Sequence, residues 1–371
     1  MNRRKFVFAG GTVAALGLGA TAVAMTGTGT MEEYAAAAEV LRARLTERPA
    51  LPEIVRAASL AASGHNTQPW RFRLGESRID ILPDTSRRTP VVDPDDHHLF
   101  ASLGCAAVNL EIAARAAGHL GDLRFDTAGE GAILFEFEDG QPETSSLLPA
   151  IMQRQSTRAE FDGRAVGSGE LDTLLAASRV AGVELILITD RARIEHVSDL
   201  IVAGNTAQMA DAAFVRELKD WIRFSPRRAA EAGDGLFSAA SGNPALPDWL
   251  GALMFDFVFK PESENEKYAR QLRSSSGVAV FVSERNDPEH WAKAGQSCQR
   301  FALQATALGL KHAFVNQPVE VPEVRAQLAS WLGVGDRRPD LVMRFGYGPE
   351  MPKSFRRPVA DVVVDASAGP A

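Results

Sequence analysis

Cysteine is scarce in this chain: its 371 residues include only two, Cys105 and Cys298. Two cysteines cannot build the disulfide framework of a small secreted domain or a cysteine-rich zinc site, although they leave a single disulfide open. An excess of basic charge is also missing. The net charge is −7 at pH 7, which argues against a nucleic acid as partner. The remaining composition, 45% apolar and 23% charged, is ordinary for a globular protein of one to three domains.

Long apolar runs are absent except at the N-terminus. MNRRKFVFAGGTVAALGLGATAVAM begins with a basic stretch containing Arg3 and Arg4, continues as an apolar segment diluted by glycine and threonine, and reaches small residues at 22–24. This order is typical of a secretory signal, and the adjacent arginines indicate the twin-arginine export machinery as a partner. We therefore expect residues 1–30 to be a signal peptide that directs the protein to an extracytoplasmic or periplasmic location. A retained membrane anchor is the alternative.

Helical and strand patterns are mixed along the rest of the chain, without strict alternation. The spacing of apolar residues predicts helices over residues 51–62, 93–118, 171–182 and 289–309. Strand patterns cover residues 70–74, 78–82, 183–190, 276–284 and 340–348. Residues 216–260 are rich in glycine and proline, as expected of a lid-like excursion. These patterns predict an α+β fold in which helices flank a mixed sheet.

Two of the predicted helices are similar enough to suggest an internal duplication. Both are rich in alanine, begin with acidic residues or histidine and end at glycine. Gly104 and Gly295 are 191 positions apart (295 − 104), and so are Gly118 and Gly309 (309 − 118). This spacing predicts one half before about residue 150 and a second half after it. Chance is the alternative, because alanine-rich helices capped by glycine are common.

Polar side chains gather in three short segments. They are ASGHNTQPWRF at residues 62–72, RQSTRAEFD at residues 154–162 and PKSFRRP at residues 352–358. In an extended chain Arg154, Ser156 and Arg158 would point to one face, and two guanidinium groups beside a hydroxyl suit a phosphate. Each segment alone is more often a solvated surface. Together they predict an FMN site, with cations for the phosphate and the N1–C2=O edge and amides for the pyrimidine ring.

The same segments carry a resemblance to a known family. ASGHNTQPWRF resembles the Ser-x-x-Asn-x-Gln-Pro-Trp signature of the nitroreductase superfamily, RQSTRAEFD its Arg-x-Ser-x-Arg/Lys FMN motif, and PKSFRRPVADVV its C-terminal phosphate segment. AGQSCQRFALQATALGLKHAFVNQP resembles its central helix and the loop that follows. The first two motifs stand in reverse order compared with the simple, homodimeric members. That order resembles the fused, two-repeat Acg-like branch, in which one chain mimics the dimer, with halves here at residues 31–150 and 151–371.

The resemblance implies a nitroreductase-like fold and names the residues that hold FMN. They are Ser63, His65, Asn66, Gln68, Arg154, Ser156, Arg158, Asn316, Gln317, Lys353 and Arg356. The first four stand where a partner subunit normally reaches over the ring, and the Arg-Ser motif holds the phosphate side and the N1–C2=O edge. Asn316 and Gln317 belong to the loop that faces N5. Lys353 and Arg356 complete the phosphate grip, although a one-residue insertion leaves open whether Arg356 or Arg357 takes that place.

Other polar clusters are weaker candidates. DPDDHH at residues 93–98 could ligate a metal, but an acidic cap at the start of a helix explains it better, and we expect no metal. SSSG at residues 274–277 precedes a strand and not a helix, which makes it a weak phosphate cradle. No arrangement of serine, histidine and aspartate indicates a hydrolase.

Two functions follow from the resemblance. The first is an FMN-dependent oxidoreductase that reduces small electron-poor compounds such as nitroaromatics, with the flavin carrying the redox step. The second is a protein that sequesters FMN beneath residues 216–260 with little turnover. An exported location favours the second, because nicotinamide donors are scarce outside the cytoplasm. In both, the fused halves are expected to bind one FMN per chain without dimerisation.

Overall fold

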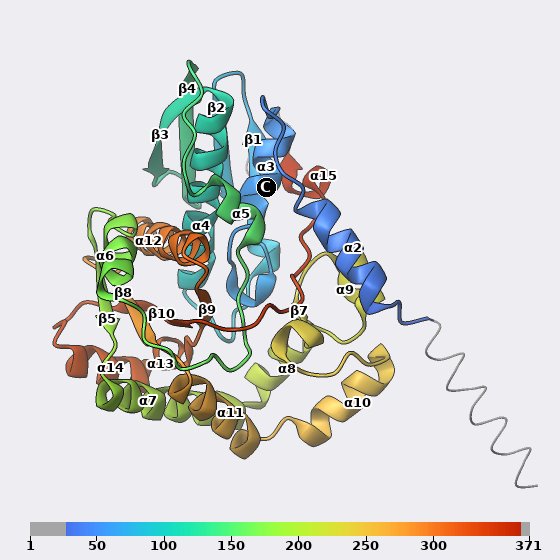
Figure 1. The fold of residues 1–371 in the computed structure, drawn as a ribbon, viewed down its shortest axis with the longest axis vertical. Helices are drawn as coiled ribbons and strands as arrows, with labels where there is room; N and C mark the ends of the chain where they lie inside the picture. The colour runs from blue at the N-terminus through green and yellow to red at the C-terminus, as the bar shows by residue number, and fades with distance from the viewer. Residues whose placement is uncertain (1–26, 365–371) are drawn as a thin grey trace, which may run out of the picture.

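The computed structural model describes residues 27–364, so residues 1–26 of the predicted signal at residues 1–30 lie outside the described part of the chain. The fold is α+β, as predicted, and is built around two separate larger sheets (Figure 1). The strands of these sheets are β1 (Trp70–Leu74), β2 (Arg78–Pro83), β3 (His119–Asp126), β4 (Ala132–Asp139), β5 (Val183–Ile188), β8 (Gly277–Ser283), β9 (Lys311–Phe314), β10 (Pro339–Gly346) and β11 (Val363–Val364).

The two sheets repeat one topology. The first has the order β11-β1-β2-β4-β3 and the second the order β5-β8-β10-β9. Leaving β11 aside, each sheet arranges its four strands as first, second, fourth and third in chain order, with every pair antiparallel. β11 adds a parallel strand to β1, which makes the first sheet mixed. The C-terminal strand therefore returns to the sheet of the first half, across the expected boundary at residue 150.

Fourteen α-helices are described around these sheets, and their bounds are α2 (Met31–Leu41), α3 (Leu51–Ser59), α4 (His97–Ala117), α5 (Leu148–Gln153), α6 (Ser168–Ala177), α7 (Arg191–Ala210), α8 (Ala212–Asp220), α9 (Pro226–Ala232), α10 (Asp248–Val258), α11 (Pro261–Arg273), α12 (Pro288–Ala307), α13 (Gln317–Glu320), α14 (Pro322–Leu332) and α15 (Val359–Val362). The helices predicted at residues 51–62, 93–118, 171–182 and 289–309 correspond to α3, α4, α6 and α12. The strand pair β3–β4 lies at residues where no element was predicted.

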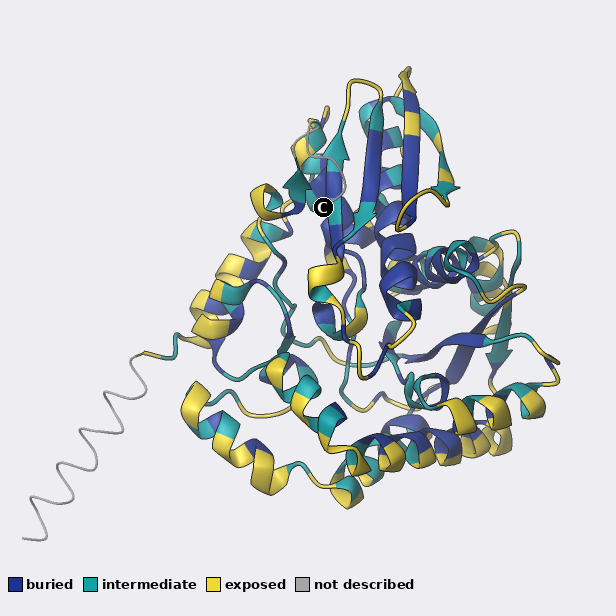
Figure 2. Ribbon diagram, turned by 180° about the vertical axis from the view of Figure 1, so that it is seen from behind, coloured by how far each residue is buried: buried dark blue, intermediate teal, exposed yellow. Residues whose placement is uncertain are grey.

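Helices α4 and α12 cross at the centre of the molecule, each following the second strand of its own sheet. Figure 2 shows that buried residues concentrate in the strands and these central helices, whereas the rim helices expose their outer faces. Cys105 on α4 and Cys298 on α12 are both buried and free, so the disulfide left open by the sequence does not form. Among the described helices only α4 is long and apolar enough to cross a membrane, and most of it is buried inside the protein.

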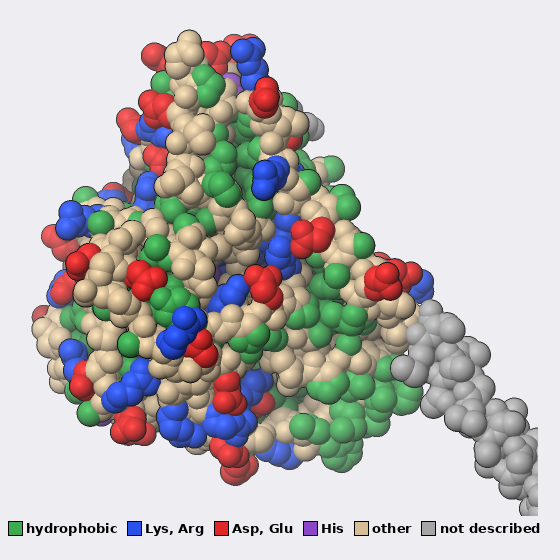
Figure 3. Space-filling view, in the orientation of Figure 1, with side chains coloured by type: hydrophobic (Ala, Val, Ile, Leu, Met, Phe, Trp, Pro, Cys, Tyr) green, Lys and Arg blue, Asp and Glu red, His purple; other side chains and the backbone are tan. Residues whose placement is uncertain are grey.

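The predicted excursion at residues 216–260 consists of short, ordered elements. It contains part of α8, then α9, α10 and a two-stranded parallel sheet of β6 (Ile222–Arg223) and β7 (Leu236–Phe237). A small buried cluster of Ala229, Phe237 and Ala240 packs with Tyr34 of α2. Only α10 keeps a large apolar surface exposed, seen as a green area near the N-terminal end of the described chain in Figure 3. The middle of the segment is thus part of the fold, because it shares a core with α2.

Candidate functional site

The turn after α3 has an unusual backbone. His65, Asn66 and Gln68 have φ values of 45°, 55° and 54°, in the left-handed region. Each such residue other than glycine costs about 1 kcal/mol or more, and such strain gathers at functional sites. A hydrogen bond from the Gln68 backbone N–H to Ser63 Oγ (3.1 Å) closes the turn. Trp70, at the start of the strand that follows, is fully buried in the core of the first half.

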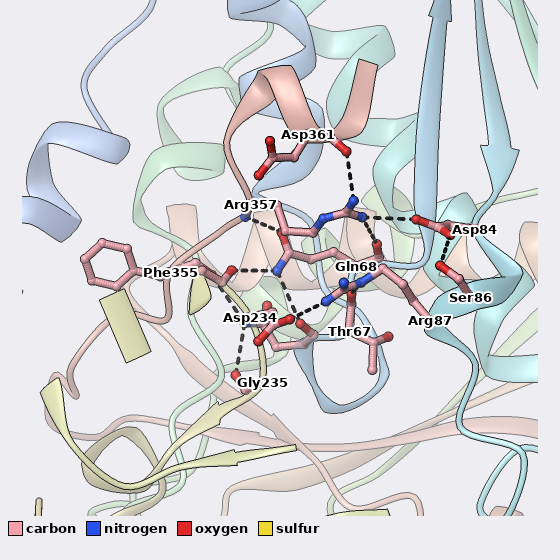
Figure 4. A network of polar contacts seen from close by, with 12 residues as sticks. Thr67, Gln68, Asp84, Ser86, Arg87, Asp234, Gly235, Phe355, Arg357 and Asp361 are labelled. Atoms are coloured by element: carbon pink, nitrogen blue, oxygen red, sulfur yellow. Dashed lines mark hydrogen bonds and ion pairs between the residues drawn. The ribbon is translucent and has the colours of Figure 1, made fainter. Parts of the chain in front are cut away.

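The strained turn directs the amides of Asn66 and Gln68 into a network that joins distant segments (Figure 4). Asn66 Nδ2 donates to the carbonyls of Gly235 (3.0 Å) and Phe355 (3.2 Å). Gln68 Nε2 donates to the carbonyl of Gly233 (2.9 Å), and Gln68 Oε1 accepts the backbone N–H of Arg357 (2.8 Å). Carbonyls of the 233–235 and C-terminal segments thus occupy the donors of both amides, and their contact with a flavin ring stays a prediction.

Charged side chains reinforce the same junction. Arg357 bonds to the Gln68 carbonyl and to Asp84, both at 3.3 Å. Arg87 bonds to the Thr67 carbonyl and pairs with Asp234. Four chain segments therefore meet around one turn, as Figure 4 shows. Of the two C-terminal arginines that the sequence left open, Arg357 belongs to this junction.

Arg356 points to a different place, where three arginines are buried together. Arg42, Arg154 and Arg356 are exposed by only 5%, 2% and 6%. Arg356 donates to the carbonyls of Ser59 (2.8 Å), Leu60 (3.2 Å) and Ala61 (3.0 Å) at the end of α3, and Arg154 Nη2 also donates to Leu60 (3.0 Å). Arg42 Nη1 donates to the carbonyls of residues 152 and 154, each at 3.2 Å. The sequence prediction found Arg154 and Arg356 but missed Arg42.

No carboxylate within residues 27–364 forms an ion pair with any of these three arginines. Burial lowers the pKa of Arg42 to about 10 and that of Arg356 well below its ordinary value, and the neighbouring guanidinium groups lower both further. Three N–H positions, Arg42 Nε, Arg154 Nε and Arg154 Nη1, are buried without a hydrogen-bond partner in the described structure. Clustered like charges with unused donors are costly unless an anion joins them, so the cluster has the chemistry of a phosphate site.

Arg158 lies in a second environment, apart from the three-arginine cluster. Burial lowers its pKa, and the Tyr268 hydroxyl, whose own pKa burial raises to about 12, interacts with it electrostatically. Burial lowers the pKa of His65 to about 4, and the charge of Arg158 contributes to that shift. The pKa of the fully buried Arg344 falls to about 9 through burial and then through Arg158. Within the described residues Arg158 forms no ion pair, so this second cationic position is also uncompensated.

His312 links the two cationic positions. It is buried, and a backbone bridge pairs it with Ser156, midway between Arg154 and Arg158. Burial lowers the pKa of His312 to about 3, followed by the charges of Arg154 and Arg344. Both of its ring nitrogens are buried without a partner among the described residues. The Arg-Ser motif thus lies in one positively charged region. Arg154 belongs to the three-arginine cluster, and Arg158 belongs to the second environment.

Lys353, Asn316 and Gln317 complete the predicted set. Lys353 Nζ pairs with Glu39 Oε1 (3.1 Å) beside a cavity of about 690 Å³ that Arg42 also lines.

Asn316 Oδ1 accepts the backbone N–H of Val342 (2.9 Å), which fixes the loop, whereas Gln317 Oε1 is buried without a hydrogen-bond partner among the described residues. Asn316 shares a cavity of about 40 Å³ with Ser63 between the halves. That volume is far too small for a three-ring flavin.

Two cations at the site escaped the sequence prediction for different reasons. Arg344 left a signal, because a single charge stands inside the apolar strand LVMRFG. Arg42 left none, since it is one of three arginines in RARLTER and only the fold selects it for burial.

Comparison with known proteins gives matches over most of the chain. No protein-family model matches. Two proteins of Mycobacterium tuberculosis H37Rv, both named "Putative NAD(P)H nitroreductase", are each 25% identical: Rv3131 over 86% of this chain and 91% of its own, and acg over 83% and 93%. A nitroreductase from Bacteroides fragilis with bound FMN aligns with 18% identity and a TM-score of 0.35, over 56% of this chain and 90% of its own. A TM-score at that level carries no weight for the fold.

The sequence matches nevertheless extend over more than four fifths of the chain, and not over one motif alone. The similarity supports the resemblance that the three polar segments carry. Over most of its length, this chain is similar to nitroreductases.

Proposed function

We propose that this chain binds FMN and is a flavin-dependent oxidoreductase of nitroreductase type that reduces small electron-poor organic compounds. The observation that carries the proposal is the cluster of Arg42, Arg154 and Arg356: three buried cations with unused donors and no carboxylate partner among the described residues. A terminal phosphate of FMN matches its charge and its N–H donors. The relatives named as NAD(P)H nitroreductases indicate the same reaction class.

The remaining residues take roles at the ring end in this proposal. Arg158 is an uncompensated cation suited to the N1–C2=O edge, where positive charge stabilises a reduced ring. Gln317 offers a buried amide oxygen without a partner, and Asn316 positions its loop. Neutral His65 adds a polar wall beside Arg158 without a second charge. FMN, when bound, would supply the hydride and electron transfer, and these residues would bind and orient it.

We also propose that the two halves are fused repeats that together complete this site. The identical strand order of the two sheets supports a duplication, as does the position of α4 and α12 after the second strand of each sheet. The phosphate cluster itself draws on both predicted halves, because Arg42 comes from the first and Arg356 from the C-terminal segment. One chain would thus supply what two subunits supply in a dimer.

A storage function is the second candidate, and the junction around Gln68 favours it. Segment 233–235 is hydrogen-bonded across the turn, and the cavity between the halves is small, so access for a second substrate is restricted. FMN-loaded protein mixed rapidly with NADPH or dithionite separates the two functions. Bleaching of the flavin by NADPH, followed by reoxidation with a nitroaromatic compound, supports the oxidoreductase. Bleaching by dithionite alone supports sequestration, and a protein that takes up no FMN contradicts both.

We propose, finally, that residues 1–30 direct export by the twin-arginine route. That route carries folded proteins, which suits a cofactor captured before transport. Replacing Arg3 and Arg4 with lysine should leave the precursor in the cytoplasm. Unchanged export of the double variant, measured by cell fractionation, would contradict this route.

A further inference from the structure

A carboxylate and two imidazoles lie together inside the protein at the start of α4. Asp93, His97 and His98 each offer one ligand atom within 4.8 Å of the other two. Their exposed fractions are only 4%, 1% and 9%. Buried polar atoms are nearly always hydrogen-bonded, yet His97 Nδ1 and His98 Nε2 have no partner in the described part of the chain. Two unused imidazole nitrogens beside one carboxylate need an explanation other than core packing.

The hydrogen bond made by His97 leaves one of its nitrogens free to bind a cation. Its Nε2 lies 2.9 Å from Asp340 Oδ1, and a carboxylate accepts the single N–H of a neutral imidazole. Nδ1 then carries the lone pair. Asp340 is itself held by the backbone N–H of Ser283 (2.6 Å). A carboxylate that orients a histidine from its far side is the usual support of a metal-ligating histidine.

Two more carboxylates border the cluster. Asp93 accepts the backbone N–H groups of His98 and Leu99, each at 3.0 Å, so it caps the helix as the sequence predicted and is held in place. Glu320 approaches from α13 in the other half. Its Oε1 lies 3.6 Å from His98 Nδ1, too far for a hydrogen bond, and its Oε2 accepts from Gln208 Nε2 at 2.6 Å. Glu320 Oε1 therefore faces the Nδ1 side of His98, and Glu320 joins the other three ligands only by turning towards the unused Nε2 of that ring.

We propose that Asp93, His97, His98 and Glu320 bind one divalent transition-metal ion, with Zn²⁺ or Co²⁺ as the best match. Two imidazole nitrogens and two carboxylate oxygens suit these ions, whereas Mg²⁺ and Ca²⁺ prefer oxygen ligands alone. The two carboxylates would neutralise the charge of the ion. Asp340 is a positioning residue that acts through His97. Since Glu320 comes from the second half and the other ligands from the first, the ion would join the two halves.

The test uses tag-free, flavin-free full-length protein stripped with a chelator and titrated with Zn²⁺ and with Co²⁺. We expect one ion per chain, a visible absorption band of four-coordinate Co²⁺ and a higher Tm with Zn²⁺, since a ligand that binds only the folded state stabilises it. His98→Gln and Glu320→Gln should each weaken Zn²⁺ binding at least tenfold. Asp340→Asn should weaken it about ten- to a hundredfold, the usual effect of losing such a support.

His290→Gln is the matched control. His290 is a buried histidine in the first turn of α12 that bonds to Asp287 (2.7 Å), outside any described cluster of three ligands, so this variant should bind Zn²⁺ as the wild type does. The proposal is overturned if the wild type binds no stoichiometric Zn²⁺. It is equally overturned if Glu320→Gln and His98→Gln both bind as tightly as the wild type. The wild-type titration decides the matter even where a variant fails to fold.

Discussion

Gly104 on α4 and Gly295 on α12 make the same contact from opposite sides of the helix crossing. A Cβ on Gly104 would lie 1.9 Å from the carbonyl oxygen of Ala292, and a Cβ on Gly295 would lie 1.9 Å from that of Ala101. Ala101 and Ala292 are themselves 191 positions apart (292 − 101), the spacing of the two glycines. Reciprocal contacts of this kind are those of a two-fold symmetric dimer interface, which supports the proposal of fused repeats.

Alanine at either glycine should destabilise the protein, and by similar amounts. Each added methyl would overlap backbone atoms that cannot move independently, so we expect a loss of about 1–3 kcal/mol or more in the free energy of unfolding. Gly169→Ala is the control, because its Cβ would meet nothing within 4 Å. Urea denaturation measures all three. If alanine at one of the two crossing glycines left the free energy of unfolding unchanged, the two contacts would not contribute equally to stability.

Arg154→Met should weaken FMN binding without lowering the stability of the flavin-free protein. Loss of a charge-assisted contact should weaken FMN binding by about 1.5–3 kcal/mol, roughly ten- to a hundredfold. The flavin-free protein should be as stable as the wild type or more so, because an unpaired buried charge is replaced by an apolar group of similar length.

Arg44→Met is the control for this experiment, since Arg44 is exposed on the wall of the cavity that Arg42 lines. Flavin fluorescence titration and urea denaturation give the two quantities. A variant that keeps its affinity but loses stability would make Arg154 a structural residue.

The flavin-free protein should lose stability as the pH falls, in part through His312. Burial, Arg154 and Arg344 lower the pKa of this imidazole to about 3, so it stays neutral in the folded state while the unfolded chain takes up a proton below its ordinary pKa of about 6.5. Its contribution is complete above that value and is lost progressively as the pH falls towards 3.

For one proton the free energy of unfolding changes by about 1.4 kcal/mol per pH unit. His312→Gln should have a shallower slope by about that amount between about pH 4 and 6. Some slope should remain, because the pKa of His65 is also lowered, to about 4. Equal slopes in the two proteins would mean that His312 is charged in the folded state.

Gln68→Ala should loosen the junction that ties segment 233–235 to the C-terminal segment. The buried side chain both accepts from Arg357 and donates to Gly233, so its removal leaves unpaired groups worth about 1–3 kcal/mol. Hydrogen exchange should become faster at the Arg357 amide and around residues 233–237. Gln153→Ala, on an exposed side chain, should leave exchange unchanged. If the amides of Gln68→Ala stayed as protected from hydrogen exchange as those of the wild type, the ion pairs and not Gln68 would hold the junction together.

The sequence predicts the two central helices α4 and α12 and five of the strands, because regular periodicity is a local property. The strand Trp70–Leu74 and the long helix ending at Gly118 appear where their patterns place them. The pair β3–β4 was missed, since β3 is only half-buried along its length. The junction at Gln68 could not be foreseen either. The positive φ values that turn its amide towards Gly233 depend on contacts between residues more than 160 positions apart, and local pattern does not encode them.

The residues of the candidate site were likewise predicted only in part. Arg154 and Arg356 lie in motifs and were predicted, whereas Arg42 joins them only because α2 packs beside the C-terminal segment. The expected lid at 216–260 was inferred from glycine and proline content. In the structure those residues make tight turns between short ordered elements that share a core with Tyr34, and whether the segment covers a site stays a prediction.

The central claim, that one chain forms a complete FMN site, is tested most directly by FMN titration combined with the mass of the complex in solution. Purified protein titrated with FMN and followed by flavin fluorescence gives the number of sites, and light scattering on the same sample gives the mass. The account predicts one FMN per chain in a particle of single-chain mass. One FMN per two chains in a dimeric particle, or no uptake of FMN at all, would contradict it.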